Sequence, residues 1–319
     1  MIIHPWLRKA RETSAEGLNW LDRLPSLVEQ ACSDWQLVIT GVPYSGGICG
    51  WVAPVRCASG DAVLKISWPH TEAKAEAVAL RWWDGVGAVR LLAESPDTWT
   101  MLLERCRPGT PLRNAGLPSE RGLAIGATGL NALWSKGVPS TDESPFDTMA
   151  ALCNEWADEA EQRLETHGAA LVALGTDPSI LRAGIELLRS LPRSAERQVV
   201  VHGDFNPGNV LAASRLPYLA IDPKPMVGDP AYDPWSLVAQ LDWPFRLHDA
   251  ERVVVSRVGW LAGALNLPAQ RIAAWGIARD VQGGLWAASE GNPPLGAKWI
   301  RSAMIMAAAL GRWDSSFQG

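Results

Sequence analysis

A short polar turn between two apolar runs constrains the fold of this chain more than any other segment. Residues 199–201 are three valines, and a second apolar run begins at Val210-Leu211. Between these runs lie His202-Gly203-Asp204-Phe205-Asn206-Pro207-Gly208-Asn209. Branched apolar runs bounded by Gly, Pro, Asp and Asn predict strands that are joined by a turn. We therefore expect Asp204 and Asn209 to be held at the end of a buried strand.

A second carboxylate follows the next short apolar segment. Tyr218-Leu219-Ala220-Ile221 leads directly into Asp222. Because Mg²⁺ prefers oxygen ligands, an acid, an amide and a further acid at neighbouring strand ends can converge on one phosphate–metal centre. Asp, Asn, Gly and Pro also build ordinary turns, so both interpretations stay open at this point.

Bulk composition excludes several classes of protein. The 319 residues are 47% hydrophobic and 20% charged, which is typical of a globular chain long enough for two lobes. A formal net charge of −5 disfavours nucleic-acid binding. The five cysteines form no C-x-x-C pair, and no apolar run reaches the length of a membrane span. We expect a cytoplasmic protein with reduced thiols and no membrane partner.

The first hundred residues have the pattern of a small antiparallel sheet. The expected strands are 35–42, 51–57, 62–67, 88–93 and 98–103, and they follow one or two short helices at 13–31 that we expect Pro25 to interrupt. The turn Tyr44-Ser45-Gly46-Gly47-Ile48-Cys49-Gly50 lies between the first two strands. Backbone N–H groups at Gly46 and Gly47 could approach phosphate oxygens, although a plain hairpin turn has the same pattern.

Lys65 lies inside the third of these strands, where an unpaired ammonium group would be costly. Its side chain must reach either solvent or an anion. The next segment, 71–83, has helical periodicity and carries Glu72 and Glu76. We favour Glu76 as the partner of Lys65, because Glu72 lies in the first turn, where the helix dipole already explains a carboxylate.

Glu104-Arg105-Cys106-Arg107-Pro108-Gly109 breaks the strand pattern with charge, Pro and Gly. We interpret it as a linker in which the backbone of Glu104, Arg105 and Cys106 hydrogen bonds to a nucleotide base, or as an ordinary connection. Helical patterns follow at 120–136, 146–173, 179–191, 248–264, 268–289 and 296–312. Two further expectations concern polar residues: His202 is buried behind its turn, and Asp229 either caps a helix or braces that turn.

These motifs together resemble the aminoglycoside phosphotransferase family. The resemblance rests on His202 to Asn209, on Ile221-Asp222-Pro223-Lys224-Pro225 and on Gly228-Asp229-Pro230-Ala231-Tyr232-Asp233. The segments 76–85 and Leu103-Glu104-Arg105 resemble the streptomycin 6-phosphotransferase and hydroxyurea phosphotransferase branch of that family.

The resemblance implies an α+β, bilobal, protein-kinase-like fold. Residues 1–106 would form a small antiparallel-sheet lobe that binds nucleotide, and 107–319 a larger, mainly helical lobe that holds the catalytic residues and the substrate. The implied cofactors are ATP and Mg²⁺. Asp204 would be the catalytic aspartate, and Asn209 and Asp222 the metal ligands. Lys65, steadied by Glu76, would hold the α- and β-phosphates.

The sequence also favours a small acceptor over a peptide. Gly203 stands where protein kinases place an arginine, and the interval 223–228 leaves little room for an activation segment. The resemblance implies phosphorylation of streptomycin at its 6-hydroxyl, with hydroxyurea or a metabolite alcohol as the alternative acceptor. A nucleotide-binding pseudoenzyme is a further alternative, which the intact motifs disfavour. The two guanidinium groups of streptomycin call for carboxylates and stacking rings, for which the candidates are Glu155, Asp158, Glu159, Trp235, Asp242, Trp286 and Glu290.

Overall fold

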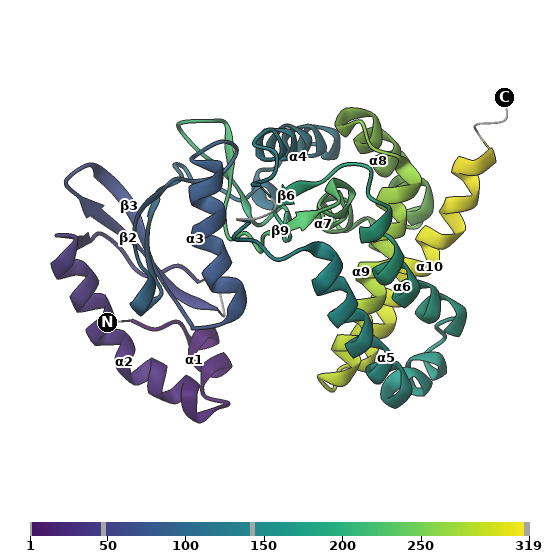
Figure 1. The fold of residues 1–319 in the computed structure, drawn as a ribbon, viewed down its shortest axis with the longest axis horizontal. Coiled ribbons are helices and arrows are strands. Elements are labelled where there is room, and N and C mark those ends of the chain that lie inside the picture. The colour runs from purple at the N-terminus through teal and green to yellow at the C-terminus, as the bar shows by residue number, and fades with distance from the viewer. Residues whose placement is uncertain (1, 46–48, 141–143, 316–319) are drawn as a thin grey trace. The chain divides into compact units, whose positions relative to one another are not determined.

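The computed structural model of the chain describes residues 2–45, 49–140 and 144–315. The chain divides into two compact units (Figure 1). We call the first, Met1–Thr110 with Leu211–Lys224, the sheet unit, and the second, Pro111–Val210 with Pro225–Gly319, the helical unit. The segment 211–224 thus joins the sheet unit although it follows most of the helices in the sequence.

A five-stranded antiparallel sheet forms the centre of the sheet unit. Its spatial order is β1 (Val38–Ile39), β2 (Gly50–Cys57), β3 (Gly60–Ser67), β5 (Thr100–Glu104) and β4 (Leu91–Ser95). Five strands were expected, and this sheet has five. The first is much shorter than the expected 35–42, because α2 continues to Asp34 and Trp35 is its C-cap. The fourth begins at Leu91 rather than Ala88, because Ala88 forms a parallel bridge with Ala220 instead. The segment 211–224 supplies this bridge, and its strands β7 (Val210–Ala212) and β8 (Tyr218–Ala220) pair with each other.

The two faces of this sheet pack against different helices (Figure 1). Leu64 and Ile66 of β3 are fully buried in one cluster with apolar residues of α2 (Ala15–Asp34). Successive side chains of a strand point to opposite faces, so Lys65 points away from α2. It meets α3 (Thr71–Trp83), which covers the other face and has the bounds that its periodicity predicted. The register of β3 therefore places Lys65 on the face of the sheet that α3 covers.

The expectation that Pro25 interrupts a helix is wrong. The helix α2 continues through Pro25, and the break comes earlier, between α1 (Pro5–Arg11) and the N-cap Ser14. Proline removes one backbone hydrogen bond from a helix. Here the buried stripe that includes Leu21, Leu24 and Leu27 keeps the helix on the sheet, because tertiary packing supplies most helical stability in proteins.

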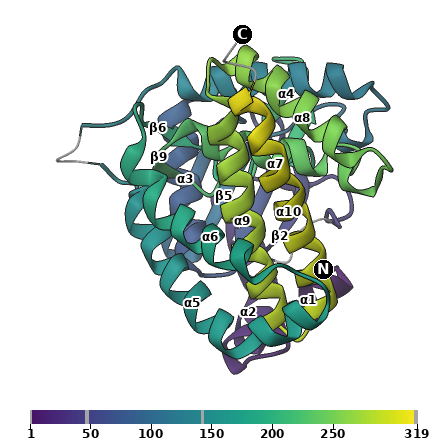
Figure 2. The same ribbon diagram turned by 90° about the vertical axis from the view of Figure 1, so that its right-hand side faces the viewer.

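The helical unit is built around α9 (Ala269–Ser289). This helix packs against α5 (Met149–Ala173), α6 (Pro178–Ser190), α8 (Ala250–Leu265) and α10 (Pro293–Ser315), as Figure 2 shows for α10. A Cβ atom at Gly284 of α9 would lie 2.9 Å from the backbone oxygen of Gly296 in α10. The two helices can therefore approach closely only because both positions are glycine. The predicted helical segments agree with these bounds to within a few residues.

The remaining elements of the helical unit are short. Strands β6 (Val199–Val201) and β9 (Met226–Gly228) pair in antiparallel fashion. The helices α4 (Ser119–Trp134) and α7 (Pro234–Gln240) are the remaining α-helices of the described residues. The 3₁₀ turns of the described chain are η1 (Pro96–Thr98), η2 (Leu112–Asn114), η4 (Pro192–Ser194), η5 (Pro230–Tyr232) and η6 (Pro244–Arg246). In the described residues, we find no helix with the length and apolar character that a bilayer crossing requires.

Candidate active site

In the sheet unit, one buried lysine is held by two carboxylates. The Nζ atom of Lys65 lies 2.7 Å from Oε1 and 2.6 Å from Oε2 of Glu76, and 2.7 Å from Oδ1 of Asp222. Lys65 is 8% exposed and Glu76 is 3% exposed. The pair predicted from the sequence is therefore present, and Asp222 joins it from the segment 211–224.

This arrangement keeps the lysine charged. Burial alone would lower the pKa of Lys65, but the charges of Glu76 and Asp222 raise it above its ordinary value. Asp222 has a positive φ of 58°, a conformation that Asp tolerates better than most residues, and its side chain remains 52% exposed. The cluster thus presents a fixed cation beside a carboxylate that reaches solvent. Fixed positive charge next to an accessible carboxylate is the combination that nucleotide phosphates and their metal ion require.

In the helical unit, the loop after β6 positions the carboxylate of Asp204. Asn206 Nδ2 lies 3.0 Å from Oδ1 of Asp204, and Asn209 Nδ2 lies 3.2 Å from Oδ2. Asn209 Nδ2 also donates to the backbone oxygen of Asp204 at 3.0 Å, while Gly208 N donates to Asn206 Oδ1 at 2.8 Å. Both carboxylate oxygens are therefore oriented by amides of the same loop. The role of Asn206 was missed, although its place between Asp204 and Asn209 is the signal that could have indicated it.

Asp233 braces the start of this loop through hydrogen bonds to its backbone. His202 N and Gly203 N each donate to one of its carboxylate oxygens at 2.9 Å, and Trp134 Nε1 donates at 3.2 Å. Asp233 is 0% exposed, and burial raises its pKa. Gly203 has a φ of 78°, which glycine adopts without strain. The aspartate thus holds two consecutive backbone N–H groups at the point where the strand becomes the loop.

Sequence reasoning assigned this bracing role, as one of two options, to Asp229 instead. Asp229 accepts a bond from Ala231 N at 3.0 Å and caps the 3₁₀ turn η5, whereas the N-cap of the helix that follows, α7, is Asp233. Its remaining bonds come from Trp275 Nε1 at 2.7 Å and from Arg271, both of α9. The bracing role belongs to Asp233, four residues later in the same turn.

His202 is buried, as expected, with 0% of its surface exposed. Asp204 N lies 3.3 Å from His202 Nδ1, and the imidazole packs edge-on against Phe205 with ring centroids 5.4 Å apart. These contacts support the loop from inside the helical unit.

Glu104, the first residue of the linker, is bound by other residues of the sheet unit. Glu104 accepts from Arg215 Nε at 2.8 Å and from Arg90 N at 3.0 Å. Burial alone would raise the pKa of Glu104, but these hydrogen bonds lower it. The backbone N–H of Glu104 also donates to Arg90 O at 2.9 Å. A contact between a base and the backbone of Glu104, Arg105 and Cys106 stays a prediction. Gly46 and Gly47 lie outside the described residues.

Arg215 was missed by the sequence analysis. It comes from the segment 211–224 and also donates to the backbone oxygens of Gly85 and Ala88, at 2.7 Å and 2.9 Å. It thereby ties this segment to the sheet unit. Nothing in the local sequence distinguishes it from a surface arginine.

Comparison with known families identifies the family of this chain. Residues 34–291 match the family described as aminoglycoside/hydroxyurea antibiotic resistance kinases. The chain belongs to this family. It is 35% identical to the streptomycin 6-kinase of Streptomyces glaucescens over 314 residues, which cover 94% of each chain. It is 32% identical to the hydroxyurea phosphotransferase of Kitasatospora aureofaciens over 315 residues, which cover 94% of this chain and 84% of that one.

The fold of this kinase agrees with solved structures. It matches an aminoglycoside phosphotransferase, solved in complex with ADP and hygromycin B, with a TM-score of 0.59 at 13% identity. The match covers 88% of this chain and 97% of that chain. The expectation of a protein-kinase-like α+β fold, with an antiparallel sheet in one part and mainly helices in the other, is confirmed. The assignment of nucleotide binding to 1–106 and of catalysis to 107–319 stays a prediction.

The acidic residues of α5 behave as a solvated helix face in this kinase. Asp158 pairs with Arg189 at 2.8 Å, Glu159 pairs with Arg163 at 3.0 Å, and Glu155 is exposed. Exposed pairs of this kind contribute little to stability. A substrate role for these three carboxylates stays a prediction.

The other expected acceptor contacts divide into buried and exposed residues. Trp235 is 2% exposed and donates from Nε1 to Asp280, so its ring cannot serve as the stacking surface that the sequence indicated. Trp286 of α9 is 48% exposed, and Glu290 is the exposed C-cap of the same helix. Asp242 accepts from Ser119 Oγ at 2.7 Å. Asp280 was missed by the sequence analysis, because one acid within a helical segment gives no signal of burial.

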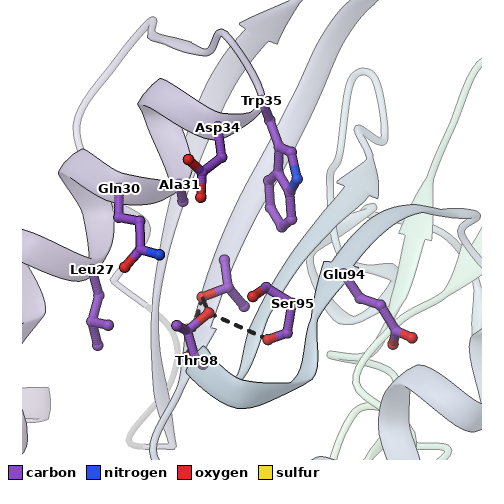
Figure 3. Close-up of a pocket in the computed structure, with 9 residues that line it drawn as sticks. Leu27, Gln30, Ala31, Asp34, Trp35, Glu94, Ser95 and Thr98 are labelled. Atoms are coloured by element: carbon purple, nitrogen blue, oxygen red, sulfur yellow. Dashed lines mark hydrogen bonds between the residues drawn. The ribbon is translucent and has the colours of Figure 1, made fainter.

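A cavity of about 130 Å³ in the sheet unit is not the candidate site (Figure 3). It lies between the end of α2 and the β4–β5 connection, with Asp34, Trp35 and Glu94 among its walls. Thr98 Oγ1 donates to Ser95 O at 3.3 Å and closes one side. Sites for drug-sized ligands measure about 300–1,000 Å³, so this cavity is too small for a nucleotide or an aminoglycoside.

The donor chemistry of two residues fits the magnesium ion that this fold implies. Asn209 turns its Nδ2 towards Asp204, which leaves the amide oxygen for another partner, and Asp222 carries an exposed carboxylate. Both are hard oxygen donors. The two residues belong to different units, and in the described residues no three His, Cys, Asp or Glu side chains form a metal site.

Proposed function

We propose that this chain is an ATP-dependent kinase that phosphorylates the 6-hydroxyl of streptomycin and so inactivates the antibiotic. The observation that carries the choice of acceptor is the similarity to a streptomycin 6-kinase over 94% of both chains. The loop around Asp204 and the charged cluster around Lys65 supply the residues that phosphoryl transfer needs. Because the reaction consumes ATP, we propose that the enzyme acts in the cytoplasm.

Asp204 acts on the acceptor in this mechanism. One of its oxygens accepts a hydrogen bond from the acceptor hydroxyl and takes the proton as the new oxygen–phosphorus bond forms. The bond between the γ-phosphorus and the bridging oxygen breaks, and ADP leaves with the electron pair. The amides of Asn206 and Asn209 orient the carboxylate before the acceptor arrives, so that little reorganisation is needed in the reaction.

Lys65 acts on the nucleotide. Its ammonium group binds the α- and β-phosphates, and Glu76 keeps the side chain extended across the α3 face of the sheet. Asn209 and Asp222 would hold magnesium, which supplies charge neutralisation along the phosphates. In the structure, Asp222 also accepts from Lys65, so metal and lysine share one carboxylate in this proposal.

A second acceptor has its own supporting observation. The 32% identity to a hydroxyurea phosphotransferase makes hydroxyurea the alternative, with the same residues in the same roles. Hydroxyurea is small and neutral, whereas streptomycin carries two guanidinium groups. Charge on the acceptor therefore separates the two candidates.

An acceptor panel tests the proposal. Purified protein with ATP and Mg²⁺ is assayed for ADP release with streptomycin, with hydroxyurea and with a gentamicin-type aminoglycoside. We expect turnover with streptomycin, and NMR of the product locates the phosphate at the 6-position. Turnover with hydroxyurea alone would replace the first candidate by the second, and absence of turnover with every acceptor would refute the proposed reaction.

The control for this panel is Asp204→Asn. Asn preserves the size of the side chain but cannot accept the hydroxyl proton, so we expect turnover to fall by roughly 10³-fold or more. ATP binding, measured by calorimetry, should stay within about twofold of the wild type. A variant with turnover near that of the wild type would show that Asp204 does not have the role given to it.

A further inference from the structure

Asp280 of α9 is a partly buried carboxylate that the proposed reaction does not yet use. Its Oδ1 accepts a hydrogen bond from Trp235 Nε1 at 3.0 Å. Among the described residues, no lysine or arginine forms an ion pair with it, and the only charge that acts strongly on it is that of the neighbouring Arg279. Asp280 is partly exposed, and no described residue donates a hydrogen bond to its second oxygen.

The fold holds this carboxylate in a defined orientation. The ring of Trp235 lies across Gly276, one helical turn before Asp280, where an added Cβ would come within 2.7 Å of the ring. Because Gly276 has no side chain, the indole can pack on α9 and direct its N–H at Asp280. The ring centroid of Phe245, which is partly exposed, lies 5.8 Å from that of Trp235. Asp280 is thus oriented by the indole of Trp235.

The same short turn connects Asp280 with the catalytic loop. Asp233 of this turn braces the loop, and Trp235, two residues later, binds Asp280. Between them and α9, Arg279 lies over the ring of Tyr232 at 4.2 Å and donates to the backbone oxygen of Tyr232 at 3.1 Å. The segment 232–235 thus contacts both the loop that carries Asp204 and the helix α9 that carries Asp280.

A partly buried carboxylate without a counter-ion is costly to a folded protein. Burial raises the pKa of Asp280 to about 7, against the hydrogen bond from Trp235 and the charge of Arg279, which lower it. An amide side chain would accept the same indole N–H without this cost. A cationic ligand supplies the missing counter-charge, and a guanidinium group fits well, because it forms charge-assisted hydrogen bonds with a carboxylate.

We propose that Asp280 determines acceptor specificity by binding a guanidinium group of the substrate through its second oxygen, while Trp235 positions the carboxylate. This inference rests on the proposed streptomycin kinase activity. It assigns acceptor recognition to α9 and the turn before α7, whereas the acidic face of α5 keeps its role as a solvated surface.

Steady-state kinetics of Asp280→Asn test the assignment. Asn keeps the acceptor for Trp235 but removes the charge, so we expect the KM for streptomycin to rise at least tenfold. The KM for ATP should stay within about twofold. The matched control is Glu186→Gln on α6, which removes one negative charge from an exposed position and should leave both constants unchanged.

A second variant keeps the test informative if Asp280→Asn does not fold. Trp235→Phe retains the ring and the charge of Asp280 but removes the N–H donor, so the KM for streptomycin should rise by a smaller factor. Circular dichroism and thermal melting confirm that each variant is folded. If the folded variants keep the wild-type KM for streptomycin, Asp280 does not bind the acceptor.

The outcomes separate this inference from the proposed function. Wild-type turnover of streptomycin together with an unchanged KM in Asp280→Asn would overturn the inference and leave the function intact. Turnover of hydroxyurea alone, or of no acceptor, would overturn both. A higher KM in Asp280→Asn and an unchanged one in Glu186→Gln support the assignment, since the loss of net charge is the same in both.

Discussion

Replacing Asp233 by asparagine should damage both the stability and the catalysis of this kinase. In the wild type, each carboxylate oxygen accepts one backbone N–H at 2.9 Å, from His202 and from Gly203. Asparagine has one acceptor oxygen and one NH₂ group. Whichever way the amide turns, one of the two backbone N–H groups faces a donor instead of an acceptor.

The cost can be estimated from these bonds. A buried N–H without an acceptor costs about 1–3 kcal/mol, and a bond to a neutral acceptor is weaker by roughly 1 kcal/mol than one to a charged acceptor. We therefore expect Asp233→Asn to lower the free energy of unfolding by about 2–4 kcal/mol. Because the affected residues precede Asp204 directly, a shift of the loop by about 1 Å should lower kcat roughly 100-fold.

Asp229→Asn is the matched control. Asp229 lies in the same turn and is 2% exposed, but its partners are Ala231 N, Trp275 and Arg271 rather than the loop. This change should also destabilise the protein by a few kcal/mol. It should leave kcat close to the wild-type value at temperatures where the variant is folded.

Urea denaturation gives the free energy of unfolding of each variant. ADP-release kinetics with saturating streptomycin and ATP give the kcat of each variant. The reasoning fails if Asp233→Asn keeps kcat within about threefold of the wild type. It also fails if Asp229→Asn lowers kcat as much as Asp233→Asn does, because the effect would then come from general loss of stability.

Two further predictions concern buried charges. Glu76→Gln should raise the KM for ATP roughly tenfold, because Lys65 loses a charged partner that keeps its side chain extended. Glu72→Gln, at the start of α3, should leave this KM unchanged. Equal effects of the two changes in steady-state kinetics would contradict the assignment. Asp280→Asn should be more stable than the wild type at neutral pH. The pKa of Asp280 is about 7 in the folded protein and about 4 in the unfolded chain. The free energy of unfolding of the wild type therefore falls as the pH rises from about 4 to about 7, and this residue causes no further fall above pH 7. The full shift corresponds to about 4 kcal/mol, which the partial exposure of the side chain reduces. Thermal melts of both proteins between pH 4 and 8 measure the difference, and a gap that does not grow with pH would refute the account.

Local patterns in the sequence were sufficient for most of the elements and for the residues with simple chemistry. The alternation in β3 and the helical spacing of α3 predicted a lysine–glutamate pair eleven residues apart, and Lys65 and Glu76 form it. The Gly, Pro, Asp and Asn content of 202–209 predicted the loop that presents Asp204. Such features depend on contacts between close neighbours in the chain, which backbone geometry limits to few arrangements.

The tertiary structure decided which of several similar residues has a given task. The sequence offered Asp229 and Asp233 in one turn, and only the packing of that turn against His202, 31 residues away, selects Asp233. The partners Trp235 and Asp280 are 45 residues apart, and Glu104 and Arg215 are 111 apart. Burial and pairing at such separations depend on how whole helices and strands pack, so a residue type or a spacing does not encode them. The sequence by itself therefore determined the reaction-bearing loop and the family, whereas the brace of that loop and the carboxylate proposed to recognise the acceptor emerged only from the packed helices.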